Sequence, residues 1–266
     1  MPTPVPILLY HSVARDVAPR YRDYALPPET FAAQMAYLHQ HGYTPITITS
    51  LIMALNGFAA LPERAVAITF DDGLADFYAG ALPVLRRYGF AATLYITTGY
   101  VGATSRWLER AGEGRRPMLT WSQVAEVDAS GVECGGHSHT HPQLDTLPLA
   151  TAREEIACCR DILEQRLGRP VRTFAYPHGY HGPAVRRLVQ EAGYSSACAV
   201  KHATSSTADD RFALARIVVA ADTDMRAFAG LVSGHALPAA PSRERVQTRG
   251  WRVVRRSAAR LKRAFA

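Results

Sequence analysis

The sequence has few cysteines, no long apolar run and almost no net charge over most of its length. Its four cysteines include no C-x-x-C pair, which argues against a disulfide scaffold and indicates free thiols in a reducing compartment. No apolar run approaches the ~20 residues that a membrane-spanning helix needs. The N-terminus has no basic segment before its short apolar stretch, so it does not predict a signal peptide, and we expect a cytoplasmic protein.

The basic charge is confined to the C-terminal end. The whole chain carries +7, and residues 241–266 hold nine Lys and Arg against one Glu, a net +8. Subtracting that +8 from +7 leaves −1 for residues 1–240. We therefore expect no nucleic-acid partner, because a nearly neutral body offers no extended basic surface. We divide the chain into one domain over residues 1–240 and a basic helical tail over residues 241–266.

Short apolar runs alternate with helical patterns, which is typical of an α/β protein with a parallel sheet. The predicted strands are Val5–Tyr10, Ala65–Phe70, Ala92–Thr97, Val132–Gly136, Thr173–Tyr176, Ser196–Val200 and Ala215–Val219. The predicted helices are Pro28–His41, Tyr78–Tyr88, Trp121–Ser130, Ala150–Leu167, Pro183–Ala192 and Met225–Val232. Seven predicted strands that alternate with helices favour a closed or nearly closed barrel. A doubly wound sheet is the alternative, although no G-x-G-x-x-G follows the first strand.

Polar residues follow four of the predicted strands. In both architectures the chemistry takes place at the carboxyl ends of the strands, so these residues are the candidates for a site. They are His11, the pair Asp71-Asp72 before Gly73, the three histidines of His137–His141, and His178 between Pro177 and Gly179.

The aspartates and histidines together predict a metal site. Two adjacent carboxylates repel each other unless a cation or a proton intervenes, so one of Asp71 and Asp72 can ligate a metal while the other acts as a base. For an isolated Asp-Asp-Gly, a solvated turn is the alternative. His137 and His141 are the predicted ligands, and His139, offset by two, is expected to point elsewhere. Two histidines and one carboxylate leave open coordination positions, which suits catalysis.

Two further residues are candidates for proton transfer and charge stabilisation. Pro177 fixes the backbone and Gly179 permits close approach, so the amide N–H of His178 could form an oxyanion hole; an ordinary turn is the alternative. His11 could act as a general acid or could cap a turn.

These residues resemble the motifs of a known enzyme family. Thr69-Phe70-Asp71-Asp72-Gly73 and His137-Ser138-x-x-His141 are similar to the motifs of the metal-dependent polysaccharide deacetylases, which include the rhizobial chitooligosaccharide deacetylase. Leu119-Thr120-Trp121, His141-Pro142-x-Leu144 and Phe174–Gly179 also match, so the resemblance covers most of the chain. It implies a distorted (β/α)7-type barrel in a single domain. It also implies that Asp71 is the base and that Asp72, His137 and His141 bind Zn²⁺ or a similar divalent ion.

The sequence departs from the common pattern of that family in two places. Ala175 stands where many members have an arginine that tethers the catalytic aspartate, and we predict that Arg216 replaces it. Many members also carry the acid in a late Leu-x-His motif, whereas this chain has Leu9-Tyr10-His11 at its start. This order resembles that of the poly-N-acetylglucosamine deacetylases. We therefore predict His11 as the acid, with His235 as the alternative.

The resemblance predicts a metal-dependent hydrolase. Its substrate would be an N-acetylated amino sugar in a polysaccharide, an oligosaccharide or a lipid-linked glycan. One alternative is a deformylase or amidase acting on a formamido sugar or a non-sugar amide. A second alternative is a catalytically inactive glycan-binding module, against which the intact set of four site residues argues.

The tail has an amphipathic pattern. Helical spacing places one apolar stripe opposite the arginines, formed by Trp251, Val254, Ala258, Leu261 and Phe265. This pattern is typical of a helix lying on an anionic membrane, which predicts peripheral contact with the inner membrane face. A terminal helix docked on the core is the alternative.

Overall fold

The centre of the molecule is a sheet of parallel strands. The computed structural model describes residues 5–205, 210–234 and 246–264, with side chains of the last segment from Gly250 to Ala259. The strands follow the order β10 (Ile217–Val218), β1 (Ile7–Tyr10), β5 (Ala65–Phe70), β6 (Thr93–Ile96), β7 (Glu133–Gly136), β8 (Thr173–Ala175) and β9 (Ser196–Cys198). In addition, β4 (Thr44–Ile46) pairs with the first half of β5, and β2 (Ser12–Val13) pairs separately with β3 (Ala25–Leu26).

The chain between β9 and β10 nearly closes the sheet into a barrel. The Ala197 and Ala199 amides donate to the carbonyls of Arg211 and Leu214 at 2.9 and 2.8 Å. The same segment then runs into β10, which pairs with β1 in the register Leu8 to Ile217. The prediction of a distorted (β/α) barrel is confirmed, and the alternative of a doubly wound sheet is wrong.

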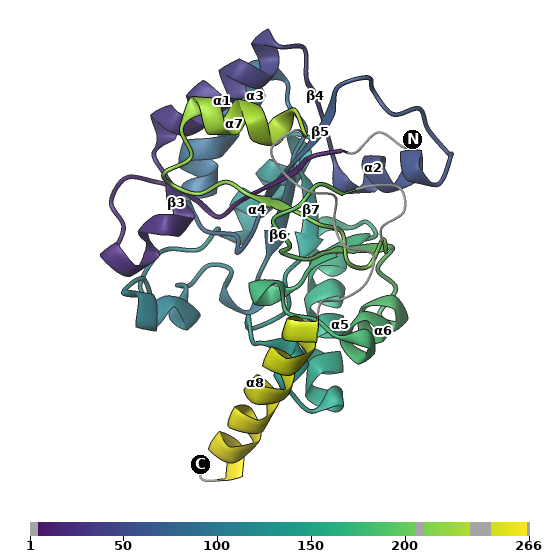
Figure 1. The fold of residues 1–266 in the computed structure, drawn as a ribbon. Coiled ribbons are helices and arrows are strands. Elements are labelled where there is room, and N and C mark those ends of the chain that lie inside the picture. The colour runs from purple at the N-terminus through teal and green to yellow at the C-terminus, as the bar shows by residue number, and fades with distance from the viewer. Residues whose placement is uncertain (1–4, 206–209, 235–245, 265–266) are drawn as a thin grey trace.

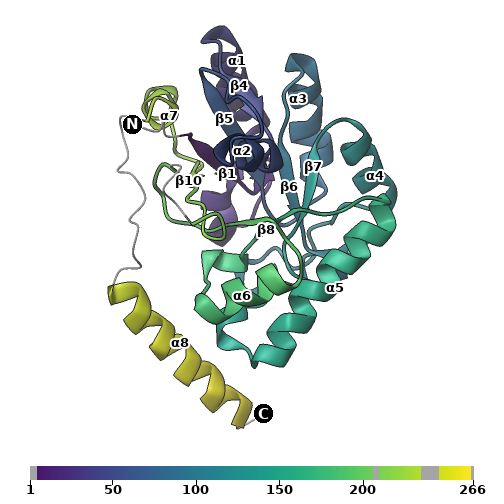
Figure 2. The same cartoon turned by 90° about the vertical axis from the view of Figure 1, so that its right-hand side faces the viewer.

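Helices surround the barrel (Figures 1 and 2). They are α1 (Pro28–Gln40), α3 (Leu82–Tyr88), α4 (Trp121–Ala129), α5 (Leu149–Leu167), α6 (Pro183–Glu191) and α7 (Met225–Val232). The predicted helix from Tyr78 begins instead as a π-helical turn, Phe77–Ala81, before α3. The tail forms α8 (Val246–Ala264), which projects from the body near α6. Within the described residues, no helix is both long and apolar enough to cross a membrane.

Helix α2 (Ile48–Leu55), which the sequence analysis did not predict, closes the amino-terminal end of the barrel. The Ile48 amide donates to Thr93 Oγ1 at 3.0 Å, and the Thr49 amide donates to Glu133 Oε2 at 3.2 Å. Thr93 and Glu133 are the first residues of β6 and β7. These bonds therefore fix α2 over the amino-terminal end of the barrel, which is the end opposite the candidate site.

Alternate residues of each strand face two different cores, as the pleat of a strand requires. Leu8 and Ile68 pack outward against the helices. Ile7 and Ala67 pack inside the barrel with α2. The same alternation along β5 directs Thr69 and then Asp71 inward at the carboxyl end of the barrel, where both are buried.

Strand β7 ends in two glycines, Gly135 and Gly136, and neighbouring rings leave no room for a side chain at either position. A Cβ on Gly135 would lie 2.7 Å from the Tyr95 ring, and a Cβ on Gly136 would lie 2.3 Å from the Tyr194 hydroxyl. Glycine at both positions therefore lets β7 sit between these two tyrosines, and His137 follows directly at the mouth of the barrel.

Candidate active site

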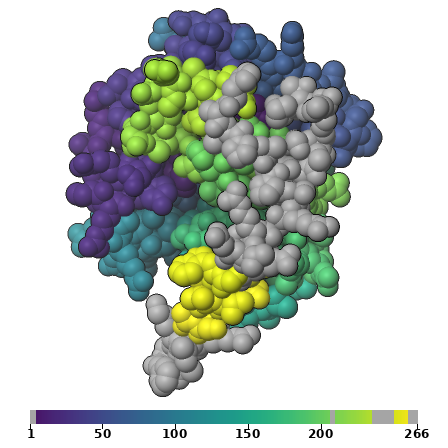
Figure 3. Space-filling model, viewed as in Figure 1, coloured from purple at the N-terminus to yellow at the C-terminus, as the bar shows by residue number. Residues whose placement is uncertain are grey.

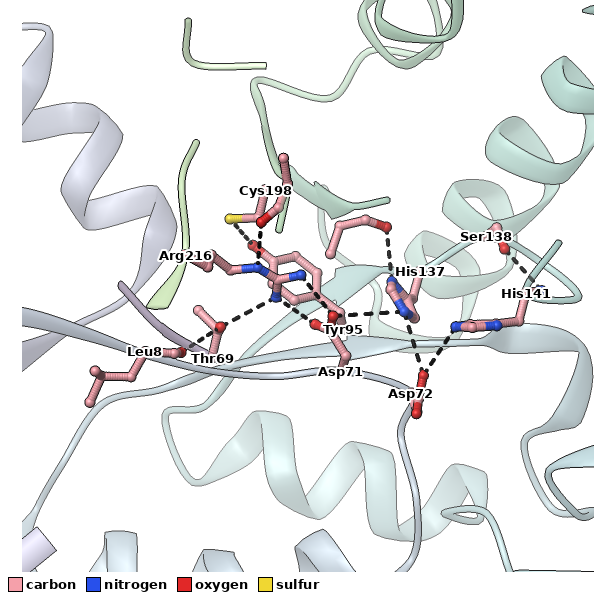
Figure 4. A network of polar contacts seen from close by, with 12 residues as sticks. Leu8, Thr69, Asp71, Asp72, Tyr95, His137, Ser138, His141, Cys198 and Arg216 are labelled. Carbon is pink, nitrogen blue, oxygen red and sulfur yellow. Dashed lines mark hydrogen bonds and ion pairs between the residues drawn. The ribbon is translucent and has the colours of Figure 1, made fainter. Parts of the chain in front are cut away.

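Three buried side chains converge at the carboxyl end of the barrel. His137 Nε2 lies 3.5 Å and His141 Nε2 lies 3.2 Å from Asp72 Oδ1. The three possible ligand atoms all lie within 4.8 Å of one another. Figure 4 shows both imidazoles directed at the Asp72 carboxylate. Two imidazoles and one carboxylate form a donor set that suits Zn²⁺ and similar divalent ions.

The backbone fixes the tautomer of His137. Its Nδ1 lies 2.8 Å from the Ala175 carbonyl oxygen, which can only accept, so Nδ1 carries the proton. The Nε2 lone pair is then free to face Asp72 and a metal. Such support of the second ring nitrogen is the usual environment of a metal-binding histidine. The donor set and its orientation therefore fit the metal that the sequence predicts.

Asp71 lies beside this set and is held by Arg216. Both Asp71 oxygens accept from the guanidinium, Oδ1 from Nη1 at 2.6 Å and Oδ2 from Nη2 at 2.7 Å. Arg216 is fully buried and also donates to the Ala199 carbonyl and to Thr69 Oγ1. The structure thus places Arg216 where the sequence analysis expected a substitute for the missing tether at Ala175.

The electrostatics of the site keep both aspartates ionised. Burial would raise the pKa of Asp71, but the charge of Arg216 and its hydrogen bonds outweigh the effect of burial and lower the pKa. Burial would also raise the pKa of Asp72, yet its contacts with the imidazoles of His137 and His141 hold it well below its ordinary value. Burial lowers the pKa of His141, which favours the neutral, metal-binding ring.

Backbone strain is concentrated at this site. Outside glycine, the described part of the chain has five residues with positive φ, and four of them belong to the site loops. They are Asp72 at 77°, Ser138 at 62°, His141 at 62° and His178 at 58°. Such conformations cost ~1–3 kcal/mol each and persist only where surrounding contacts enforce them. The motif spacing gave no signal of this strain.

His178 lies at the rim of the site. Its ring meets the His141 ring edge-on at 4.7 Å between centroids. The residue is exposed in part, yet desolvation and the nearby His141 lower the pKa of His178 to about 4. No acceptor for the His178 amide occurs among the described residues, so this N–H is available to a substrate oxygen.

His11 reaches the same mouth from β1. The Asp71 amide donates to the Tyr10 carbonyl at 3.0 Å, which sets His11 beside the aspartates. Burial lowers the pKa of His11, while the negative charges of Asp72 and Asp71 oppose that shift. The alternative acid, His235, lies outside the described residues.

Neighbouring residues shape the metal-binding loop. His139 turns away, with Nδ1 3.0 Å from Thr98 Oγ1, and so does not join the predicted ligands. Trp107 stacks on His141 at 5.0 Å between ring centroids. Glu155 of α5 accepts from the Thr140 amide at 2.7 Å. The motifs alone did not identify Glu155, because its contact depends on how α5 packs beside the loop.

The chain is similar in sequence and in fold to known proteins. The model of the polysaccharide deacetylase family matches residues 59–197, about half of the chain. YxkH of Bacillus subtilis, named as a polysaccharide deacetylase, is 26% identical over 87% of this chain and 77% of its own length. The poly-beta-1,6-N-acetyl-D-glucosamine N-deacetylase of Escherichia coli is 32% identical over 48% of this chain, but the match covers only 20% of that protein. The structure of IcaB from Ammonifex degensii is 26% identical and covers 87% of this chain and 97% of its own, with a TM-score of 0.73.

Proposed function

Because the chain belongs to the polysaccharide deacetylase family, we propose that it hydrolyses the N-acetyl groups of an amino sugar in a polysaccharide or oligosaccharide. The observation that carries this proposal is the buried Asp71, held ionised by Arg216 beside the set Asp72, His137 and His141. A base next to a three-ligand metal set is an arrangement that can hydrolyse an unactivated amide.

In the proposed reaction, Asp72, His137 and His141 would hold Zn²⁺ or a similar divalent ion. The bound ion would polarise the amide carbonyl and lower the pKa of the attacking water. Asp71 takes the proton of that water as its oxygen bonds to the carbonyl carbon. The His178 amide N–H donates to the carbonyl oxygen as negative charge develops there. Protonated His11 gives its proton to the nitrogen as the C–N bond breaks, which releases acetate and the free amine.

The test combines metal content with product release. Mass spectrometry should find bound metal in the wild type and none in His137→Ala, and His139→Gln should keep it because His139 faces Thr98. Oligomers of N-acetylglucosamine should release acetate with the wild type. Asp71→Asn should bind metal but release acetate ~10²–10⁴-fold more slowly. Metal binding without acetate release from any N-acetylated glycan would refute the proposed function.

A second amide substrate remains compatible with the same groups. A formamido sugar or a non-sugar amide would use the same base, metal and acid, and release of formate rather than acetate would identify the former. A catalytically inactive glycan-binding module would not require the ion pair between Arg216 and Asp71. Catalytic turnover with either product would exclude it.

We further propose that the substrate is a lipid-linked or nascent glycan met at the inner membrane face, with α8 touching an anionic membrane. The support is the exposure of three apolar side chains on α8: Trp251, Val253 and Val254 are 54%, 64% and 55% exposed. In Figure 3 the described part of α8 lies in yellow on the outside of the molecule. The full-length protein should float with anionic vesicles, and Trp251→Glu should reduce flotation. Equal flotation of both proteins would contradict membrane contact.

A further inference from the structure

The tail helix binds a buried carboxylate in the loop that carries the metal ligand His141. Asp145 lies four residues after His141, in the short 3-10 helix η5 (Leu144–Thr146), and is 2% exposed. Arg255 of α8 donates to both of its oxygens, Nη1 to Oδ1 at 2.8 Å and Nη2 to Oδ2 at 2.7 Å. Arg256 donates to the Asp145 carbonyl at 2.7 Å. The tail is therefore docked by its arginine face.

The same guanidinium contacts a second loop of the site. The Arg255 Cζ lies 3.6 Å from the centroid of the Tyr180 ring, a cation–π distance. Tyr180 follows His178 by two residues. Arg255 thus joins the loop after β7, which supplies His141, to the loop after β8, which supplies His178.

The carboxylate of Asp145 is partnered by the tail. Among the described residues, every hydrogen bond and ion pair recorded for its oxygens comes from α8, with Arg252 Nε as a further cation at 3.7 Å. A buried carboxylate that loses such partners destabilises the conformation that buries it. The loop conformation around Asp145 and the docking of α8 therefore depend on each other.

His141 needs such support. Its φ is 62°, and its Nδ1 is buried without a hydrogen-bond partner in the described structure. Unlike His137, it is not oriented through its second ring nitrogen. On the amino-terminal side, Ser138 Oγ accepts from the His141 amide at 3.0 Å. On the carboxyl-terminal side, the loop is held by the bonds of Asp145 to Arg255.

We propose that the pair Arg255–Asp145 is a positioning device for His141, and that α8 thereby raises the affinity of the site for its metal. The inference rests on the metal set of the proposed function but not on the substrate. It makes residues 246–264 part of the catalytic unit rather than an appended tail. Loss of a group that hydrogen-bonds a metal ligand directly weakens metal binding ~10–100-fold. Asp145 acts on His141 through the backbone between them, so we expect an effect at the lower end of that range.

The test measures Zn²⁺ affinity by competition with a chromogenic chelator, in the full chain and without substrate. Asp145→Asn and Arg255→Ala should each weaken binding ~10-fold, the lower end of the range for supports of a metal ligand. Combining them should weaken it little further, because the two residues act through one contact. Arg255→Lys should restore part of the affinity, and substitution with Co²⁺ should show an altered ligand-field spectrum in Arg255→Ala.

The matched control is another ion pair that joins a helix to a loop away from the metal. Arg169 donates through two nitrogens to Asp128 of α4, which lies outside the site loops. Asp128→Asn should lower the melting temperature but leave the Zn²⁺ affinity within ~2-fold, a change of under ~0.5 kcal/mol. Wild-type affinity in Asp145→Asn and Arg255→Ala, or equal weakening in Asp128→Asn, would overturn the inference. Acetate release plays no part in this readout, so failure of the proposed substrate leaves it standing.

Discussion

Replacement of Arg216 by glutamine tests the central electrostatic contact of the site. In the wild type the guanidinium donates to both oxygens of Asp71, and the two side chains are 0% and 3% exposed. Removing one partner of a buried pair costs ~3–5 kcal/mol, because the remaining charge stays desolvated. At ~2–4 °C per kcal/mol for a chain of this size, the melting temperature should fall by ~6–20 °C.

The same substitution should change the pH dependence in a known direction. Arg216 lowers the pKa of Asp71 against the effect of burial, so without Arg216 the pKa should rise. Deacetylation needs the carboxylate form, and the acid limb of kcat/KM should therefore move to higher pH in Arg216→Gln. The free energy of unfolding should also decrease toward low pH. The contribution of Asp71 is present above the unfolded pKa and is lost as the pH falls through the lowered folded value.

A double-mutant cycle separates the pair from general damage. Asp71→Asn and Arg216→Gln should each destabilise the protein, and the double variant should be more stable than the sum of the two losses predicts. Arg216→Lys should fall between wild type and Arg216→Gln, since it keeps the charge but loses the two-nitrogen contact. An unchanged melting temperature together with an unshifted acid limb in Arg216→Gln would refute the reasoning.

Three other predictions follow from the site and its frame. His11→Gln should lower kcat ~10²–10⁴-fold while metal content by mass spectrometry stays at the wild-type level, and a parallel loss of metal would contradict its role as acid. Gly135→Ala should cost ~1–3 kcal/mol in thermal unfolding because of Tyr95, whereas Gly250→Ala on α8, with open space around it, should not destabilise. At pH 8 a thiol reagent should label Cys158 first, because it is partly exposed whereas the other three cysteines are buried. Burial raises the pKa of all four thiols, to about 11 for Cys198 and to about 12 for Cys159, and rapid labelling of two or more thiols would contradict the prediction.

The barrel was predictable because its strands carry their own signal. Ala65–Phe70 is entirely buried and ends where predicted, and Met225–Val232 begins after an Asp224 that caps it. Glycines at positive φ end several helices, as at Gly89 and Gly168. Helix α2 escaped prediction because its apolar residues pack against the end of the barrel, a surface that exists only after the strands have assembled.

The candidate site was predictable to the extent that its residues follow strand ends. The positions of Asp71, His137 and His178 follow from parallel strands that end at one edge of the barrel. The partners that hold them are different: Arg216, Glu155 and Ala175 contact the site across long separations in sequence. Arg216 was found through the family pattern rather than through any local signal, and Glu155 was not found.

The C-terminal arginines show how one sequence pattern admits two structural outcomes. The amphipathic spacing of residues 251–265 is compatible with arginines facing anionic lipid or facing the protein. Docking takes Arg255 to Asp145 and leaves Trp251 and Val254 exposed. The arginine face of α8 therefore binds the protein, and the apolar face is the one exposed to solvent. A guanidinium bound to a buried carboxylate is not available to a lipid headgroup. Any membrane contact of the described segment must then come from its apolar side, which faces away from the loops that the arginines bind.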